Sequence, residues 1–171
     1  MTTEAGGPAD DRVELLRHTL ATLAYRAAKT CRGAPEGFGE FSIFEGARTP
    51  GEVLAHMGDL MEWARSIAEG APMWKDSDPL PWEEECDRFF AAVEALDARL
   101  AAEPPGRRPE RIFQAPIADA LTHTGQIALM RRVAGAPVLG ENYYVAPIEI
   151  GRVGSEQGPP GLEFSGEASE A

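Results

Sequence analysis

Apolar residues recur with a helical period in four stretches of the chain. In the first stretch, residues 11–32, these positions are Val13, Leu16, Leu20, Leu23 and Ala27. Their spacing of three or four residues is that of one face of an α-helix. Comparable stripes occupy residues 49–69, 81–103 and 116–133, and we expect no sheet. The pattern predicts an all-α fold, an up-and-down four-helix bundle with room for one long crossover.

Start and stop signals place the second and last helices most firmly. Thr49 can cap a helix, Pro50 suits its first position, and Glu52 three residues after the cap completes a capping box. Gly70 ends this helix, and Gly135 closes the last one.

The same signals predict the organisation of the whole chain. We expect a flexible N-terminus at residues 1–10 and the helical bundle at 11–138. Residues 139–154, where tyrosine and isoleucine are interleaved with proline and glycine, predict an extended arm lying on the bundle or on a second subunit. Residues 155–171 are rich in Gly, Pro, Ser and Glu and predict a mobile acidic tail.

The last helix carries polar residues on the face that we expect to be buried. At roughly 100° per residue one side collects six positions, which are Asp119, Thr122, His123, Gln126, Met130 and Val133. Burying an unpaired polar group costs on the order of 1–3 kcal/mol, so these groups need partners. Asp119 and His123 lie one turn apart and can share a cation.

The second helix offers a third ligand. His56 lies within its apolar face, and Asp59 lies at the edge of that face. Together, His56, Asp119 and His123 form a His–His–carboxylate set that leaves positions on a divalent cation open for water or substrate. Asp59 would orient His56 from behind, and Gln126 would bond a ligand or the substrate. The alternative is a buried Asp–His hydrogen bond without a metal.

Composition restricts the partners. The net charge is −12, from 28 acidic and 16 basic residues, which argues against nucleic acid or an anionic membrane surface. No apolar run reaches the roughly 18 residues of a membrane span, and the polar start predicts a cytoplasmic protein. Cys31 and Cys86 are predicted to be reduced structural thiols, and the acidic run 83–85 a solvated first helical turn.

The two ligand-bearing segments resemble the DinB/YfiT-like superfamily of metal-binding four-helix bundles. The resemblance covers roughly residues 11–138. It is carried by Leu54-Ala55-His56 with Asp59, and by Asp119-Ala-Leu-Thr-His123-Thr-Gly-Gln126-Ile followed by Arg131-Arg132 and Gly135. In that superfamily a histidine on the second helix and two residues four apart on the last helix bind the metal, usually nickel or zinc. Many members have histidine where this chain has Asp119; the mycothiol-dependent maleylpyruvate isomerase branch has a carboxylate there.

The resemblance implies a low-molecular-weight-thiol S-transferase or isomerase, in which a metal-bound thiol of the bacillithiol or mycothiol type attacks an electrophile. Two alternatives stay open: a metal-dependent hydrolase, and a non-catalytic, stress- or damage-inducible protein that binds a small ligand. The residue pattern offers Phe41, Phe44, Trp63 and Trp74 as lining for an apolar pocket, with packing as their simpler role. Residues 143–150 leave two arrangements open, a homodimer through this arm and an arm folded back on its own bundle.

Overall fold

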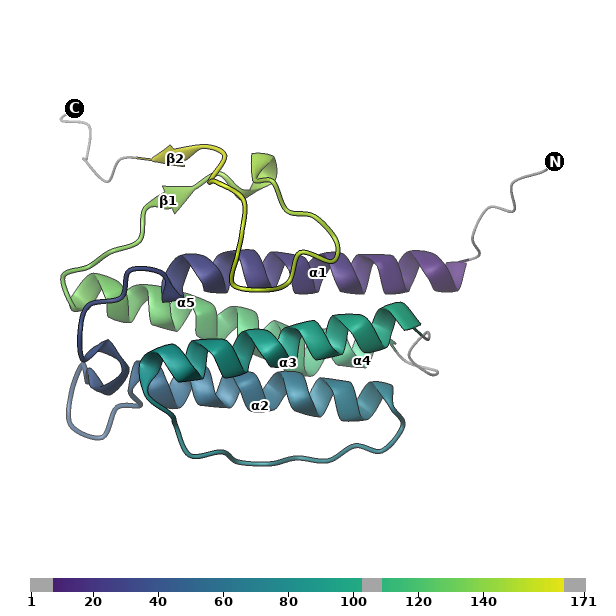
Figure 1. Cartoon of the computed structure of the whole chain (residues 1–171), viewed down its shortest axis with the longest axis horizontal. Helices are drawn as coiled ribbons and strands as arrows, with labels where there is room; N and C mark the ends of the chain where they lie inside the picture. The colour runs from purple at the N-terminus through teal and green to yellow at the C-terminus, as the bar shows by residue number, and fades with distance from the viewer. Residues whose placement is uncertain (1–7, 103–108, 165–171) are drawn as a thin grey trace.

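The computed structural model describes residues 8–102 and 109–164 and is mostly helical (Figure 1). Its long helices are α1 (Pro8–Cys31), α2 (Pro50–Ala68), α3 (Trp82–Ala102) and α5 (Ala118–Val133). The all-α class is therefore confirmed. Residues 8–10, expected to belong to a flexible N-terminus, are part of α1, whereas the predictions for 1–7, 103–108 and 165–171 lie outside the described residues.

The start of α2 has the predicted cap. The Thr49 side chain accepts a hydrogen bond from the backbone N–H of Glu52 (3.2 Å), and the Glu52 carboxylate accepts one from the backbone N–H of Thr49 (2.8 Å). Pro50 occupies the first turn, where its missing N–H costs no helical hydrogen bond. This reciprocal pair fixes where α2 begins and hence where His56 lies on it.

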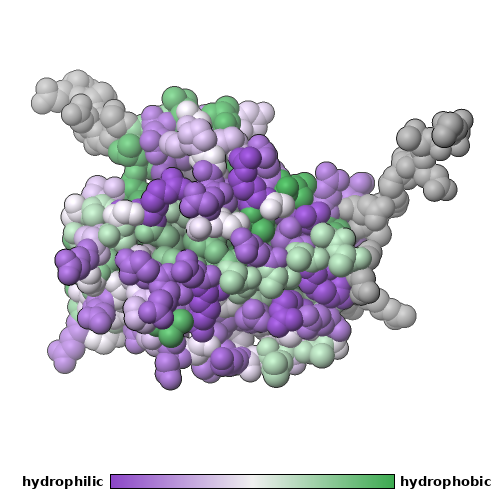
Figure 2. Space-filling model, in the orientation of Figure 1, coloured by the Kyte–Doolittle hydropathy of each residue, from purple (hydrophilic) through white to green (hydrophobic). Residues whose placement is uncertain are grey.

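The four long helices enclose the apolar core. α1 packs against α3 and α5, and α2 packs against the same two helices. The largest fully buried side chains come from all four helices, from the turns before α5 and from a short 3-10 helix, η1 (Phe38–Glu40); they are Leu20, Leu23, Phe38, Leu54, Met57, Met61, Phe89, Leu96, Leu100, Ile112, Ile117 and Ile127. Hydrophilic side chains cover much of the face seen in Figure 1, with apolar patches between them (Figure 2). Among the described residues, no helix is long and apolar enough to cross a membrane.

α2 and α3 run in the same direction. Arg88 of α3 lies 3.7 Å from Asp59 in the middle of α2, and Arg99 further along donates a 2.7 Å hydrogen bond to the carbonyl of Ala68 at the end of α2. In Figure 1 the connection 69–81 returns along α2 before α3 begins. Extended, it can reach roughly 40 Å, and the 19-residue α2 is about 28 Å long. Strict up-and-down alternation is therefore wrong for this pair, and the long crossover is residues 69–81.

Buried polar groups hold this connection to the helices. The side chain of Ser66 accepts a hydrogen bond from the backbone N–H of Met73 (2.9 Å), and Glu85 accepts one from Leu80 (2.9 Å). The Glu85 side chain is fully buried and also pairs with Arg88 at 2.7 Å. The expectation that residues 83–85 form only a solvated turn is wrong for Glu85, because its carboxylate is needed to satisfy the connection's backbone.

The last helix begins earlier than expected and contains a wide turn. α4 (Pro109–Ile112) leads through one turn of π-helix, η2 (Phe113–Ile117), into α5. Pro116 cannot donate to the helical ladder, and its ring would clash with the carbonyl four residues before it in an α-helix. The i+5 spacing of a π turn relieves that clash and puts Ile112 and Ile117 on one buried face.

The wide turn is accompanied by a rotation of α5 away from the predicted face. Its core-facing residues are Ala120, Thr124, Ile127, Met130 and Arg131, whereas Thr122 and Gln126 are exposed and Val133 is 52 % exposed. Around the helix axis, the centre of the buried face lies roughly 100° from the centre of the predicted face. This is the angle between successive residues of an α-helix. The polar residues therefore lie at the edge of the core and are not buried within it.

The C-terminal arm folds onto α1 of its own chain. β1 (Gly140–Glu141) pairs antiparallel with β2 (Glu163–Phe164), and Glu141 accepts hydrogen bonds from Tyr25 (2.6 Å), Lys29 (2.7 Å) and the backbone of Gly161 (3.0 Å). Between these strands Val153 enters the core at 5 % exposure. Residues 155–164, expected to belong to a mobile tail, are thus part of the folded arm.

Candidate metal centre

The three predicted ligands come together at the seam between α2 and α5. His56 Nε2 lies 3.5 Å from Asp119 Oδ2, and His123 Nε2 lies 3.5 Å from Asp119 Oδ1. One ligand atom from each of the three residues lies within 4.8 Å of the other two. His56 comes from α2 and the other two from α5, so packing of the two helices assembles the set.

These distances fit a shared cation better than direct hydrogen bonds. A strong N–H···O bond measures about 2.7–3.2 Å, whereas ligand atoms held about 2.0–2.1 Å from a zinc ion in tetrahedral geometry lie roughly 3.3–3.5 Å apart. Both contacts to Asp119 lie near the second spacing, each histidine facing a different oxygen of the carboxylate, and one oxygen of Asp119 lies within 4.8 Å of both imidazoles' ligand atoms. Two imidazoles and a carboxylate suit zinc, nickel or another divalent transition metal and leave coordination positions open.

Gln126 fixes the orientation of one imidazole. Its Oε1 lies 2.8 Å from His123 Nδ1. With the amide oxygen as acceptor, Nδ1 carries the proton and Nε2 turns its lone pair toward Asp119, which is the tautomer a metal ligand requires. The predicted place of Gln126 beside the site is thus a direct contact with a ligand.

Asp59 does not orient His56 in the way the sequence suggested. Its Oδ2 accepts a hydrogen bond from the backbone N–H of Ser77 (2.8 Å), and its Oδ1 faces Arg88 at 3.7 Å. The carboxylate is buried, so both oxygens need these partners. Asp59 instead fastens the 69–81 connection to α2, and that connection in turn reaches the site.

The imidazole of His56 lies beside an aromatic pair, Trp74 of the 69–81 connection and Trp63 of α2. The His56 ring meets Trp74 edge to face at 5.6 Å between ring centroids, and Trp74 meets Trp63 in the same way at 5.7 Å. The rings of His56 and His123 are 5.0 Å apart. Of the residues considered for an apolar pocket, the two tryptophans therefore lie at the site, whereas Phe44 is 67 % exposed in the loop between α1 and α2.

The centre is accessible from outside. The side chain of Asp119 is 46 % exposed, that of His56 23 % and that of His123 12 %. A groove of about 400 Å³ begins at Asp119 and is lined by Leu60, Trp63, Gln114, Ala115, Ala118, Asp119 and Thr122. The sequence pattern missed Leu60 and the residues of the π turn as parts of this groove, because apolar and alanine positions look alike in core and cleft.

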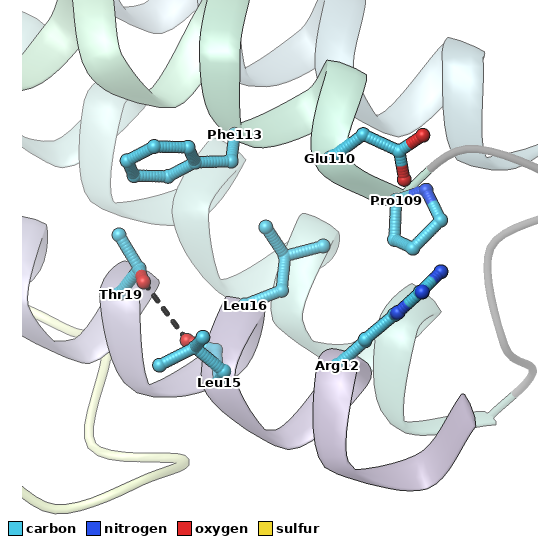
Figure 3. A pocket seen from close by; sticks show the side chains of 7 residues that line it. All are labelled: Arg12, Leu15, Leu16, Thr19, Pro109, Glu110 and Phe113. Atoms are coloured by element: carbon cyan, nitrogen blue, oxygen red, sulfur yellow. Dashed lines mark hydrogen bonds between the residues drawn. The ribbon is translucent and has the colours of Figure 1, made fainter. Parts of the chain in front are cut away.

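A second groove lies away from the centre, between α1 and α4. Figure 3 shows Leu15, Leu16 and Phe113 projecting into it, with Arg12 and Glu110 at one end; its volume is about 520 Å³. Its one hydroxyl, that of Thr19, donates a hydrogen bond to the carbonyl of Leu15 (2.8 Å), and its lining offers no set of metal ligands. Among the described residues, the one group arranged to hold a metal ion is His56, Asp119 and His123.

Comparison of the chain with protein-family models, curated proteins and solved structures finds no match.

Proposed function

We propose that the protein binds one divalent metal ion through His56, Asp119 and His123 and acts as a thiol S-transferase or isomerase of the DinB-like class on a four-helix bundle. The observation that carries the proposal is the convergence of one ligand atom from each of the three residues, on two helices, to within 4.8 Å of one another. Nickel and zinc are the metals proposed, and a low-molecular-weight thiol is the proposed second reactant.

The surroundings of the site support an open, reactive centre. When bound, the metal ion would supply a Lewis acid that favours the thiolate form of a thiol at neutral pH. The half-exposed carboxylate of Asp119 leaves one side of the site open to solvent and reactants. Gln126 holds His123 in the ligating tautomer, and Trp74 packs against the ring of His56.

The deciding experiment measures metal content. Untagged parent protein, His123→Ala and His18→Ala are purified side by side, dialysed against a mixture of divalent ions, and analysed by mass spectrometry of the metals. His18 is exposed on α1, so its variant controls for loss of a surface histidine. We expect near-stoichiometric nickel or zinc in the parent and in His18→Ala and its loss in His123→Ala. Parent protein without metal would overturn the proposal.

Gln126 gives a sharper test of the geometry. Gln126→Leu removes the acceptor for His123 Nδ1 but leaves all three ligands, so we expect roughly 10- to 100-fold weaker metal binding in competition with a chromophoric chelator. Leu129→Ala, at an exposed position on α5 outside the groove, serves as the matched control. Activity screens with electrophiles then follow, with and without added thiol, because a thiol transferase requires the thiol whereas a hydrolase does not.

A further inference from the structure

The groove beside the metal centre follows the seam between α2 and α5. Leu60 and Trp63 come four and seven residues after His56, so they continue the same face of α2. On the other side Ala118 and Ala115 precede Asp119 on the antiparallel helix. Seven residues of helix span about 10 Å, so the groove extends roughly two helical turns beyond the metal ligands.

The groove has one apolar wall and one wall of small and polar side chains. Leu60 and Trp63 form one side, and the other side carries the methyl groups of Ala115 and Ala118 beside the uncharged polar side chains of Gln114 and Thr122. Among the described residues that line it, Asp119 at the metal end is the one that carries a charge. A ligand body in this groove therefore gains from being uncharged and from turning an apolar face toward Leu60 and Trp63, while its polar head lies near the metal centre.

The aromatic wall is held in place. Trp63 is partly buried and packs against Trp74 at an interplanar angle of 88°. Trp74 is part of the connection that Asp59 fastens at Ser77. A ring whose orientation is already fixed loses little freedom when a flat partner stacks or packs on it.

We propose that this groove is the specificity site for a small aromatic molecule whose metal-binding donor lies one or two bonds from its ring. The inference rests on the proposed metal centre for the donor group, whereas the groove supplies the preference for the ring. It assigns Trp63 and Ala118 as the residues that determine which substrate is accepted.

The first experiment compares two ligands with the same donor atoms. Benzohydroxamate and acetohydroxamate are titrated into zinc-loaded protein by calorimetry. We expect benzohydroxamate to bind at least about tenfold more tightly, because the groove buries its ring. Ala118→Leu and Trp63→Leu should remove that preference, while Ala91→Leu, on the exposed face of α3, should retain it. Equal affinities of the parent protein for the two hydroxamates would contradict the proposed specificity of the groove but not the proposed metal centre.

The second experiment needs no metal, so failure of the proposed function is distinguished from failure of the groove. Metal-free protein is titrated with the neutral fluorophore N-phenyl-1-naphthylamine, whose emission rises in apolar surroundings. We expect a saturable rise that Ala118→Leu abolishes and that Leu15→Lys, in the groove of Figure 3, leaves unchanged. No rise, or a rise that only Leu15→Lys removes, would overturn the inference.

Discussion

Arg131 joins the ends of two helices, and its replacement by methionine should destabilise the protein strongly. The residue is 5 % exposed. Its guanidinium donates hydrogen bonds to the carbonyls of Thr30 (2.8 Å), Arg32 (2.9 Å), Gly33 (2.8 Å) and Ala136 (2.9 Å). It thereby satisfies carbonyls at the C-terminal end of α1, which an α-helix leaves without internal partners.

The expected loss follows from these four bonds. Arg32 and Gly33 are exposed, so water can replace the guanidinium at their carbonyls. Thr30 is buried, and leaving its carbonyl unpaired costs about 1–3 kcal/mol. Adding partial losses at the other carbonyls gives about 3 kcal/mol for Arg131→Met. In a chain of this size that corresponds to roughly 6–12 °C in Tm.

Urea denaturation of metal-free protein, followed by circular dichroism, measures the loss without a contribution from bound ions. Arg132→Met is the control, because Arg132 is exposed at the surface and its replacement should change stability by no more than about 0.5 kcal/mol. Arg131→Lys should fall between the two, since lysine cannot reach all the carbonyls from one position. A loss below about 1 kcal/mol, or equal losses at both arginines, would refute the reasoning.

Two further predictions concern the arm and the thiols. Burial alone would raise the pKa of Glu141, but hydrogen bonds from Lys29, Tyr25 and the Gly161 backbone lower the pKa below its ordinary value. The carboxylate therefore stabilises the fold above about pH 4.3, and this contribution is lost as pH falls through the folded-state pKa. In urea denaturation at a series of pH values, the stability advantage of the parent over Glu141→Gln should shrink as the pH is lowered. The control Glu149→Gln, at an exposed position, should show no such trend. The pKa of the Cys86 thiol is raised by its hydrogen bond with Cys31 and by burial. We expect slow alkylation of Cys86 by iodoacetamide at pH 7.5 and several-fold faster alkylation in Cys31→Ala; an unchanged rate would contradict this cause.

The convergence of His56, Asp119 and His123 could be predicted because it depends mainly on spacing along single helices. His56 lies on the inner side of a helix whose start is fixed by a capping box, and Asp119 and His123 share a helical turn. Neither statement requires the exact rotation of the last helix. Contact between the two helices then places the three ligand atoms together.

The rotation of α5 could not be predicted from its apolar pattern. The face that is buried carries alanine, threonine and an arginine, which differ little in polarity from the face that is not. Arginine in particular is seldom buried without partners, and three of the four carbonyls that Arg131 binds lie 98 to 101 residues away in the chain. Such long-range bonds leave no periodic signal in the sequence.

Asp59 was misassigned for a related reason. A carboxylate three residues after an inward histidine fits an orienting role, but the sequence does not reveal that the following connection crosses back over α2. Backbone N–H groups of that crossover must be satisfied where it passes over buried surface, and Asp59 supplies an acceptor at Ser77. Asp59 therefore bonds the crossover because α2 and α3 are parallel, and its spacing from His56 within α2 does not determine its partner.

Because the same rotation exposes the polar face of α5, it also explains how a charged ligand set is tolerated at the edge of a small core. Had Asp119, His123 and Gln126 faced inward as expected, each would have required a buried partner. The guanidinium of Arg131 enters the interior instead, where carbonyls at the end of α1 neutralise the cost of burying it. Ile117 and Ile127 share the buried side of this segment at 0 % exposure. The anchoring of α5 by Arg131 at one end and by the π turn at the other therefore sets the orientation of Asp119 and His123 at the seam with α2.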